Sequence, residues 1–111
     1  RELEIFSSSK GEILSNLNKR GVIYEHIGEN RFKISQNSFF QINKFLTEKL
    51  MNIVLENSHN YNKFADLFSG VGLFAIPLAK VIPRGIAIEA SKFSYKDSVD
   101  NLKLNNVKSL K

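Results

Sequence analysis

The sequence predicts an α/β fold in which a strand-helix-strand-helix unit follows a β-hairpin and helices. Three observations lead to this prediction. An apolar run at residues 64–68 leads into two closely spaced glycines, Gly70 and Gly72, and an apolar helical pattern follows them. A second apolar run at residues 85–88 ends beside a carboxylate. A strand, a tight glycine turn, a helix and a second strand form the minimal unit that holds a nucleoside-containing cofactor at the carboxyl edge of a parallel sheet.

The start of the chain predicts a short strand and a helix. Residues 2–6 suit a short strand. Ser9 and Glu12 have the Ser-x-x-Glu spacing of a capping box, and Gly21 suits the position after a helix end. We therefore expect a helix over residues 10–20. Its apolar stripe consists of Ile13, Leu14 and Leu17.

A β-hairpin and a second helix are expected next. Residues 22–27 and 31–34 are β-prone runs, and the turn-forming residues 28–30 join them. After a polar connection, Asn43 is a good N-cap for a helix that runs to about Asn57. One face of this helix carries apolar residues at helical spacing, namely Leu46, Leu50, Ile53 and Val54.

These elements divide the chain into two segments. We expect residues 1–38 to form the lead-in with a helix and a hairpin, and residues 39–111 to form the N-terminal part of a nucleoside-binding domain. A doubly wound sheet has about five strands, yet only one more helix fits after Glu89. We therefore expect the chain to be a piece of a longer polypeptide. Its truncated sheet would leave strand edges uncovered, so we expect the isolated chain to self-associate.

Charge narrows the class of partner. Sixteen Lys and Arg residues against eleven Asp and Glu give a formal net charge of +5. This excess fits an anionic partner such as RNA, and it equally fits a lysine-rich solvated surface. No apolar stretch approaches the roughly 20 residues of a membrane span, and no signal-peptide pattern is present. We therefore expect a cytoplasmic protein without a membrane partner.

Cysteine and histidine usage restricts the chemistry. The chain has no cysteine, which excludes disulfides, thiolate metal sites and cysteine nucleophiles within it. Its two histidines, His26 and His59, are far apart and lack ligand spacing, so we expect no metal site.

The glycine turn admits two classes of cofactor. Gly70 and Gly72 allow the backbone to turn sharply and approach a ligand, and we expect a helix from about Val71 to Lys80 with its first free N–H groups directed at that ligand. Pro77 falls in the second turn of this helix, where we expect a kink or an irregularity. Gly70-x-Gly72-x-x-Ala75 also satisfies the dinucleotide fingerprint, so NAD has to be considered.

Two carboxylates favour a methyl donor over NAD. Asp66 at the end of the first strand would repel a pyrophosphate, whereas S-adenosylmethionine presents a cationic sulfonium and ammonium there. Glu89 lies 23 residues later (89 − 66), which suits one strand-helix-strand unit, and a carboxylate there accepts hydrogen bonds from ribose hydroxyls. The alternative is that Asp66 caps a turn and Glu89 is a solvated strand end. The pair around a Gly-x-Gly turn favours S-adenosylmethionine.

A group of segments lies on both sides of the glycine turn, namely residues 32–43, 66–74, 77–79 and 85–89, together with Asn101 and Asn105. Their most specific block is Ser38-Phe39-Phe40-Gln41-x-Asn43, because the glycine motif alone is shared by many methyltransferases. These segments resemble the RNA uracil-C5 methyltransferases, a family that makes 5-methyluridine in transfer and ribosomal RNA. The resemblance covers roughly Val22 to Val107 and implies a truncated Rossmann-like methyltransferase domain.

The resemblance implies roles for single residues. Gln41 matches a glutamine that hydrogen-bonds the methyl donor from outside the glycine loop. Phe68 matches an aromatic position that contacts the donor, and an aromatic face attracts a nearby cation. Glu89 matches the acid that binds the ribose. Leu73 stands where several members have a polar Asn, so only its backbone N–H is expected to serve the donor.

The resemblance also implies what this chain lacks. In the family, a cysteine adds to C6 of a flipped-out uracil, and a glutamate later removes the C5 proton. Because the chain has no cysteine, we expect it to be inactive alone and to contain no catalytic residue. The expected parent is an RNA methyltransferase acting in tRNA modification or rRNA processing. Two alternatives stay open: a fragment of a dinucleotide-binding oxidoreductase, and a non-catalytic module that binds RNA or protein.

Overall fold

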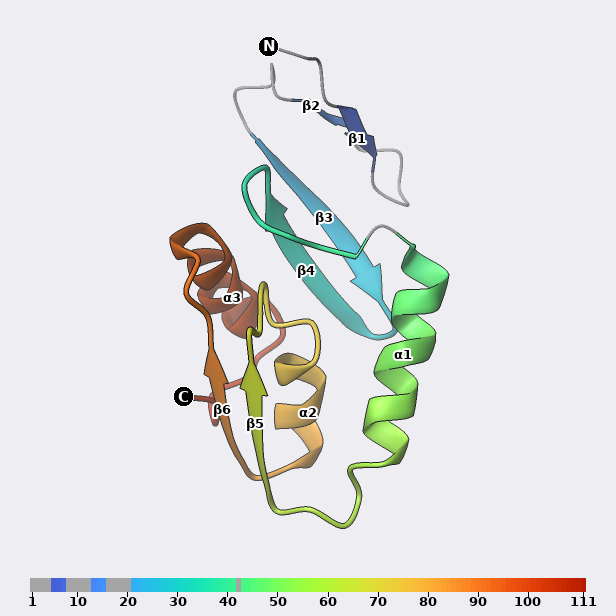
Figure 1. Ribbon diagram of the computed structural model, residues 1–111, viewed down its shortest axis with the longest axis vertical. Coiled ribbons are helices and arrows are strands. Elements are labelled where there is room, and N and C mark those ends of the chain that lie inside the picture. Colours follow the sequence, from blue (N-terminus) through green and yellow to red (C-terminus); the bar gives the residue numbers. More distant parts are fainter. Residues whose placement is uncertain (1–4, 8–12, 16–20, 42) are drawn as a thin grey trace.

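Three two-stranded sheets and three helices make up the described part of the chain (Figure 1). The computed structural model describes residues 5–7, 13–15, 21–41 and 43–111, with side chains described from residue 21 onward. The elements in chain order are β1 Ile5–Ser7, β2 Ile13–Ser15, β3 Val22–Ile27, β4 Asn30–Ser35, α1 Lys44–Glu56, β5 Lys63–Leu67, α2 Ala75–Val81, β6 Arg84–Ile88 and α3 Lys92–Leu104.

The helix predicted over residues 10–20 is wrong at residues 13–15, and its other residues lie outside the described ones. Ile13–Ser15 is the strand β2, which pairs antiparallel with β1 and places Ser15 opposite Ile5. A lone helix of this length is marginal in water, and pairing with a neighbouring segment supplies the backbone hydrogen bonds instead. β1 overlaps the strand predicted at residues 2–6. The predicted capping box at Ser9 and Glu12 lies outside the described residues.

The predicted hairpin is confirmed. β3 and β4 pair antiparallel from Val22 opposite Ser35 to Ile27 opposite Asn30, so the turn has two residues rather than the three predicted. Alternate side chains of the hairpin are buried, which is the period expected for a strand with one face in the core. The buried apolar residues of this face are Ile27, Phe32 and Ile34.

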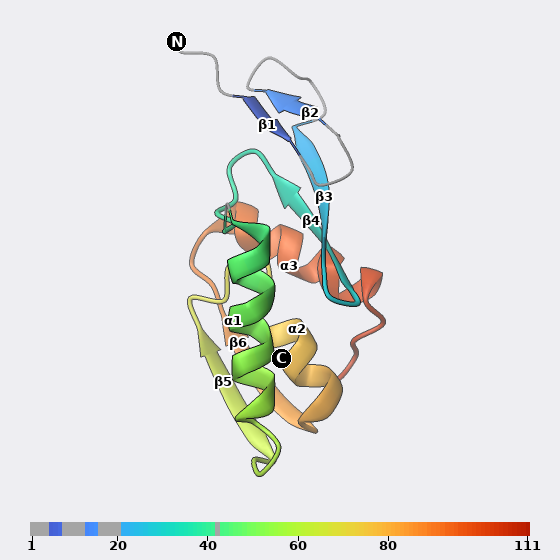
Figure 2. The same cartoon turned by 90° about the vertical axis from the view of Figure 1, so that its right-hand side faces the viewer.

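Helix α1 begins where the sequence predicts, but a different face is buried. The Asn43 side chain accepts a hydrogen bond from the Leu46 N–H at 3.1 Å, which confirms the N-cap. Thr47 and Met51 are the buried residues of this helix. The predicted apolar face is largely exposed, with relative exposures of 62% at Leu46, 47% at Leu50 and 48% at Ile53. α1 lies along the right-hand side of the molecule in Figure 1, and Figure 2, which views that side, shows it in front of the other elements.

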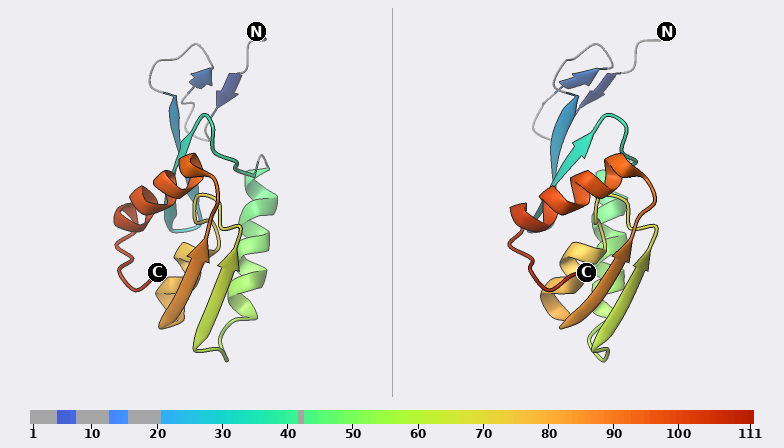
Figure 3. Two further views of the ribbon diagram at one scale, coloured as in Figure 1. Left: turned by 60° about the vertical axis from the view of Figure 1, so that its left-hand side comes forward. Right: turned by 90° about the vertical axis from the view of Figure 1, so that its left-hand side faces the viewer.

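The predicted strand-helix-strand-helix unit is confirmed by β5, α2, β6 and α3. β5 and β6 are parallel, with Asp66 opposite Ala87 (Figure 3). The helix after the glycines starts at Ala75, four residues later than predicted, because residues 71–74 form turns. Pro77 therefore lies in the first turn of α2, where its missing N–H costs nothing and does not require a kink.

The core lies between the hairpin and the glycine turn. Its buried cluster joins hairpin side chains to Met51 of α1, to Val71 and Leu73 of the turn, and to Ile76 of α2. α3 packs along β4, and Leu110 then forms a parallel bridge with Gly85 beside β6. The glycine turn is thus built on packed side chains rather than on a free loop, which fixes the carboxyl edge of the β5–β6 sheet.

One face of the β5–β6 sheet is apolar and uncovered by the described residues. Leu67, Ile86 and Ile88 are exposed, whereas the alternate residues face α2 and are half-buried. Figure 3 shows this open face toward the viewer in its left panel. Parallel sheets are ordinarily covered on both faces. None of the helices in the described ranges has the length and apolar character needed to cross a membrane.

Candidate functional site

The turn after β5 departs from ordinary backbone geometry. Gly70 and Gly72 have φ of +57° and +94°, values that favour glycine because it has no Cβ. The Gly72 N–H donates to the Ser69 carbonyl at 2.9 Å, and the Ser69 N–H donates to Ile88 at 3.0 Å. Phe68 has φ of +63°, which is strained for a bulky side chain. Such strain concentrates at functional sites, where the surrounding structure holds it.

Glu89 holds the turn from the neighbouring strand. Its Oε2 accepts from the Gly70 N–H and its Oε1 accepts from the Ser91 N–H, both at 2.7 Å. The carboxylate therefore joins the glycine turn to the start of α3. Each carboxylate oxygen can accept more than one hydrogen bond, so capacity for a ligand's hydroxyl groups remains.

Asp66 is the second carboxylate of the site. Its Oδ2 is buried and has no hydrogen-bond partner in the described structure. Burial raises the pKa of this carboxyl, a hydrogen bond from the Ala75 backbone opposes the rise, and repulsion by Glu89 adds to it. The Ala75 N–H, the first of α2, is thus directed at Asp66 rather than at open space. A buried carboxylate oxygen without a donor is a costly arrangement that a cationic ligand would relieve.

The other predicted site residues lie at different depths. Phe68 is 88% exposed, so its ring is free to cover a ligand. The side chain of Leu73 is buried in the core, and only its backbone remains for a ligand contact. Gln41 is exposed and follows Phe39 by two residues. A Cβ built on Gly70 would lie 4.0 Å from the Phe39 carbonyl oxygen, which places this upstream segment next to the turn.

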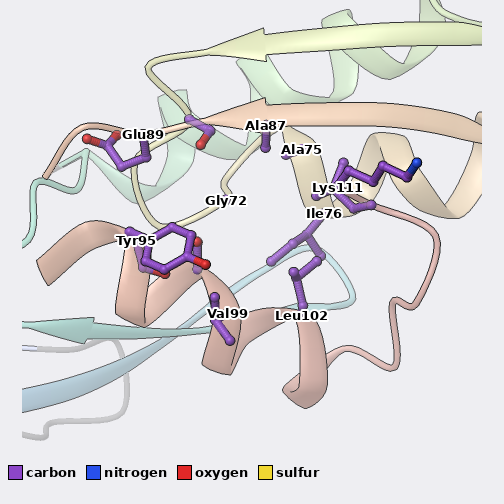
Figure 4. A pocket seen from close by; sticks show the side chains of 12 residues that line it. Gly72, Ala75, Ile76, Ala87, Glu89, Tyr95, Val99, Leu102 and Lys111 are labelled. Carbon is purple, nitrogen blue, oxygen red and sulfur yellow. The ribbon is translucent and has the colours of Figure 1, made fainter. Parts of the chain in front are cut away.

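A cavity of about 280 Å³ opens beside the turn, between β6, α2 and α3 (Figure 4). Figure 4 shows Glu89 beyond the end of β6, with Tyr95 of α3 near it at the same end of the cavity. The wall contributed by α3 follows the i, i+3, i+4, i+7 spacing of one helix face. Its residues are Tyr95, Ser98, Val99 and Leu102.

These four α3 residues were not among the site residues predicted from the sequence. Their spacing was readable after Glu89, but a helix stripe of mixed polarity is ordinarily taken as a packing face. Within the described ranges, no group of three His, Asp or Glu side chains is placed to hold a metal ion. The two carboxylates, the glycine turn and the exposed aromatic ring suit the binding of a cationic, ribose-containing molecule.

Comparisons with known proteins match this chain to RNA methyltransferases. A family model described as tRNA (Uracil-5-)-methyltransferase matches residues 15–111. An uncharacterized RNA methyltransferase of Aquifex aeolicus is 39% identical over 87 residues, covering 76% of this chain and 20% of that protein. The tRNA/tmRNA (uracil-C(5))-methyltransferase of Campylobacter concisus is 32% identical over 104 residues, covering 94% of this chain and 27% of its own length. The chain thus spans about a fifth to a quarter of these relatives.

A solved structure agrees with this match. The Pyrococcus abyssi tRNA (uracil-54, C5)-methyltransferase, determined in complex with S-adenosyl-L-homocysteine, superposes with a TM-score of 0.72 at 28% identity. The similarity covers 82% of this chain and 23% of that one.

Proposed function

Because the chain belongs to the tRNA (uracil-5-)-methyltransferase family, we propose that it is the methyl-donor-binding part of a longer RNA (uracil-C5) methyltransferase. The match confirms the family that the sequence resembles. It also favours a methyltransferase over a nicotinamide oxidoreductase or a non-catalytic module. When bound, S-adenosylmethionine supplies the methyl group, and the residues of this chain bind and orient it.

The two carboxylates support this cofactor most strongly. Asp66 and Glu89 lie near the carboxyl ends of adjacent parallel strands, and their mutual repulsion contributes to the raised pKa of Asp66. Two such groups would oppose a pyrophosphate and attract a sulfonium and an ammonium group. In this arrangement Asp66 faces the cationic amino-acid end and Glu89 accepts from the ribose hydroxyls.

The remaining predicted contacts complete the proposed site. The backbone at Gly70, Gly72 and Leu73 approaches the donor without an obstructing Cβ at the two glycines. Phe68 covers the bound molecule with its exposed ring, and Gln41 reaches it from the upstream segment. We retain residues 1–38 as the lead-in and residues 39–111 as the part of the chain that contains every proposed donor contact.

A methyl-transfer assay tests the proposed function. The full-length protein would be incubated with S-adenosyl-[methyl-³H]methionine and tRNA or rRNA transcripts, and the RNA would then be digested to nucleosides. The expected result is label in 5-methyluridine. Label in another nucleoside, or none in any RNA under conditions where the protein is folded, would contradict the proposal. The choice between tRNA and rRNA follows from which transcript is labelled, and a cytoplasmic location is the natural one for either substrate.

Asp66→Asn in the full-length protein should stabilise the protein and weaken donor binding at the same time. Because the folded-state pKa of Asp66 is raised above 3.8, the folded protein retains a proton that the unfolded chain has lost. The free energy of unfolding of the wild type therefore falls as pH rises from 3.8 through the raised pKa, and stays lower above it. The variant has no carboxyl group at this position and so lacks this fall. The difference in the free energy of unfolding between variant and wild type therefore grows with pH and is largest near neutrality.

The same variant should lose donor affinity on the order of tenfold, because a charged interaction is removed. Urea unfolding at several pH values and calorimetry with S-adenosylhomocysteine measure the two effects. If the stability of the variant relative to the wild type were lower at pH 7 than at pH 4, this would contradict the inferred burial of the charge.

The isolated chain should self-associate. Its β5–β6 sheet has an exposed apolar face with Leu67, Ile86 and Ile88, and β5 has an unpaired edge in the described structure. Uncovered edges and apolar faces favour association with other copies. Sedimentation velocity over a hundredfold concentration range should show a rising sedimentation coefficient. A monomer that stays unchanged up to the highest concentration would contradict this prediction.

A further inference from the structure

Two side chains of α3 and that of its C-cap residue, Asn105, bind the open edge of the β3–β4 hairpin. In the antiparallel hairpin, Arg31, Lys33 and Ser35 direct their main-chain groups away from β3. Asn105 accepts from the Arg31 N–H at 3.0 Å and donates to its carbonyl at 2.7 Å. Asn101 accepts from the Lys33 N–H at 2.6 Å and donates to its carbonyl at 3.0 Å.

Asp97 ends this row of contacts at Ser35. Its Oδ2 accepts from the Ser35 N–H at 2.7 Å and from the Ser38 hydroxyl at 2.6 Å, while its Oδ1 accepts from the Ser35 hydroxyl at 2.7 Å. Four residues of helix advance about 6 Å and two residues of strand advance about 6.6 Å, so side chains at i, i+4 and i+8 match alternate strand residues. The helix takes the place that another strand would occupy.

Asn101 makes one contact that its neighbours lack. Its Nδ2 also donates to the carbonyl of Val71 at 3.0 Å, and the residue is 0% exposed. Val71 lies between Gly70 and Gly72, in the turn proposed to hold the methyl donor. Both hydrogens of the amide and its oxygen are therefore used, and they connect α3, β4 and the glycine turn. Of the common side chains, only an amide of this length both donates twice and accepts.

We propose that Asn101 is a positioning residue for the glycine turn, and that it couples docking of the β3–β4 hairpin to methyl-donor affinity. Glu89 holds the Gly70 N–H from the β6 side, and Asn101 of α3 holds the Val71 carbonyl. The turn is thus fixed at the 69–70 and the 71–72 peptide groups. Order in the hairpin favours the binding conformation of the turn, and by thermodynamic reciprocity a bound donor stabilises the hairpin contact. This inference rests on the proposed function.

The test compares Asn101→Asp with Asn105→Asp in the full-length protein. Each variant keeps its size and its accepting oxygen and loses two donated hydrogen bonds, but only Asn101 contacts the glycine turn; Asn105 donates its second bond to the Asn101 carbonyl. Both variants should lower Tm. Calorimetric titration with S-adenosylhomocysteine should show at least tenfold weaker binding for Asn101→Asp and less than threefold for Asn105→Asp. Equal losses of affinity would overturn the inference.

A measurement on the wild type covers the case in which a variant does not fold. Hydrogen exchange followed by NMR should show that saturating S-adenosylhomocysteine slows the Lys33 amide at least threefold more than the Arg31 amide. Equal slowing of the two amides would overturn the coupling through Asn101. If the wild type does not bind S-adenosylhomocysteine at all, the proposed function fails, and that outcome is distinct from binding without coupling.

Discussion

Gly72→Ala in the full-length protein should destabilise it by about 2–5 kcal/mol and reduce methyl-donor affinity by more than a hundredfold. Two costs add. The φ of +94° strains any side chain, by roughly 1–2 kcal/mol. The new Cβ would also lie 2.9 Å from Ile76 Cδ1, and Ile76 is fully buried, so the packed core cannot yield cheaply. Overpacking of this kind costs about 1–3 kcal/mol.

Gly70→Ala is the matched control for this prediction. Gly70 has a positive φ as well, but a Cβ there would meet only the Phe39 carbonyl oxygen at 4.0 Å. We therefore expect a loss of only about 1–2 kcal/mol in the free energy of unfolding. Urea unfolding and calorimetry with S-adenosylhomocysteine measure both variants. A Gly72→Ala protein as stable as Gly70→Ala would show that Ile76 moves aside at little cost, and would contradict the tight packing of the turn.

Glu89→Ala should lower both the affinity for the methyl donor and the stability of the full-length protein. Loss of charged hydrogen bonds to the ribose should cost about 1–3 kcal/mol, which is roughly tenfold to a hundredfold in Kd. The Gly70 and Ser91 N–H groups would lose their acceptor as well. Leaving partly buried donors without a partner costs about 1–3 kcal/mol each, so the unfolding midpoint should fall clearly.

Glu89→Gln separates the two roles of this carboxylate. Its amide oxygen can still accept from one of the two backbone N–H groups, so we expect an intermediate loss of stability. Because a neutral amide is a weaker partner for ribose hydroxyls, affinity for S-adenosylhomocysteine should fall less than in Glu89→Ala. Unchanged affinity in Glu89→Ala, measured by calorimetry on folded protein, would contradict the ribose role.

The sequence predicted the elements whose signals are local. Apolar runs, the glycines between them and the N-cap Asn43 were sufficient to predict β5, β6 and α1. The same kind of signal failed at residues 13–15, which pair with β1 as the strand β2 instead of forming part of a helix. It also misplaced the start of α2, because the turn geometry of residues 71–74 depends on tertiary contacts with Ser69 and the core.

Only the part of the candidate site that depends on local signals could be predicted from the sequence. Asp66, Glu89 and the two glycines follow from strand ends and turn chemistry, which a linear pattern reveals. The role of Asn101 does not, since polar residues at i, i+4 and i+8 ordinarily indicate a solvated helix face. Here that face is buried because an open strand edge needs the same hydrogen bonds that water would supply. Only the fold brings β4 and α3 together.

We expect the paired acids near the strand ends, Asp66 and Glu89, to select S-adenosylmethionine and its product S-adenosylhomocysteine, which share a cationic ammonium group, over a dinucleotide. Isothermal titration calorimetry of the full-length protein, once with S-adenosylhomocysteine and once with NAD, tests this directly. We expect saturable binding of S-adenosylhomocysteine and no heat beyond dilution with NAD. Clear binding of NAD without binding of S-adenosylhomocysteine would contradict it.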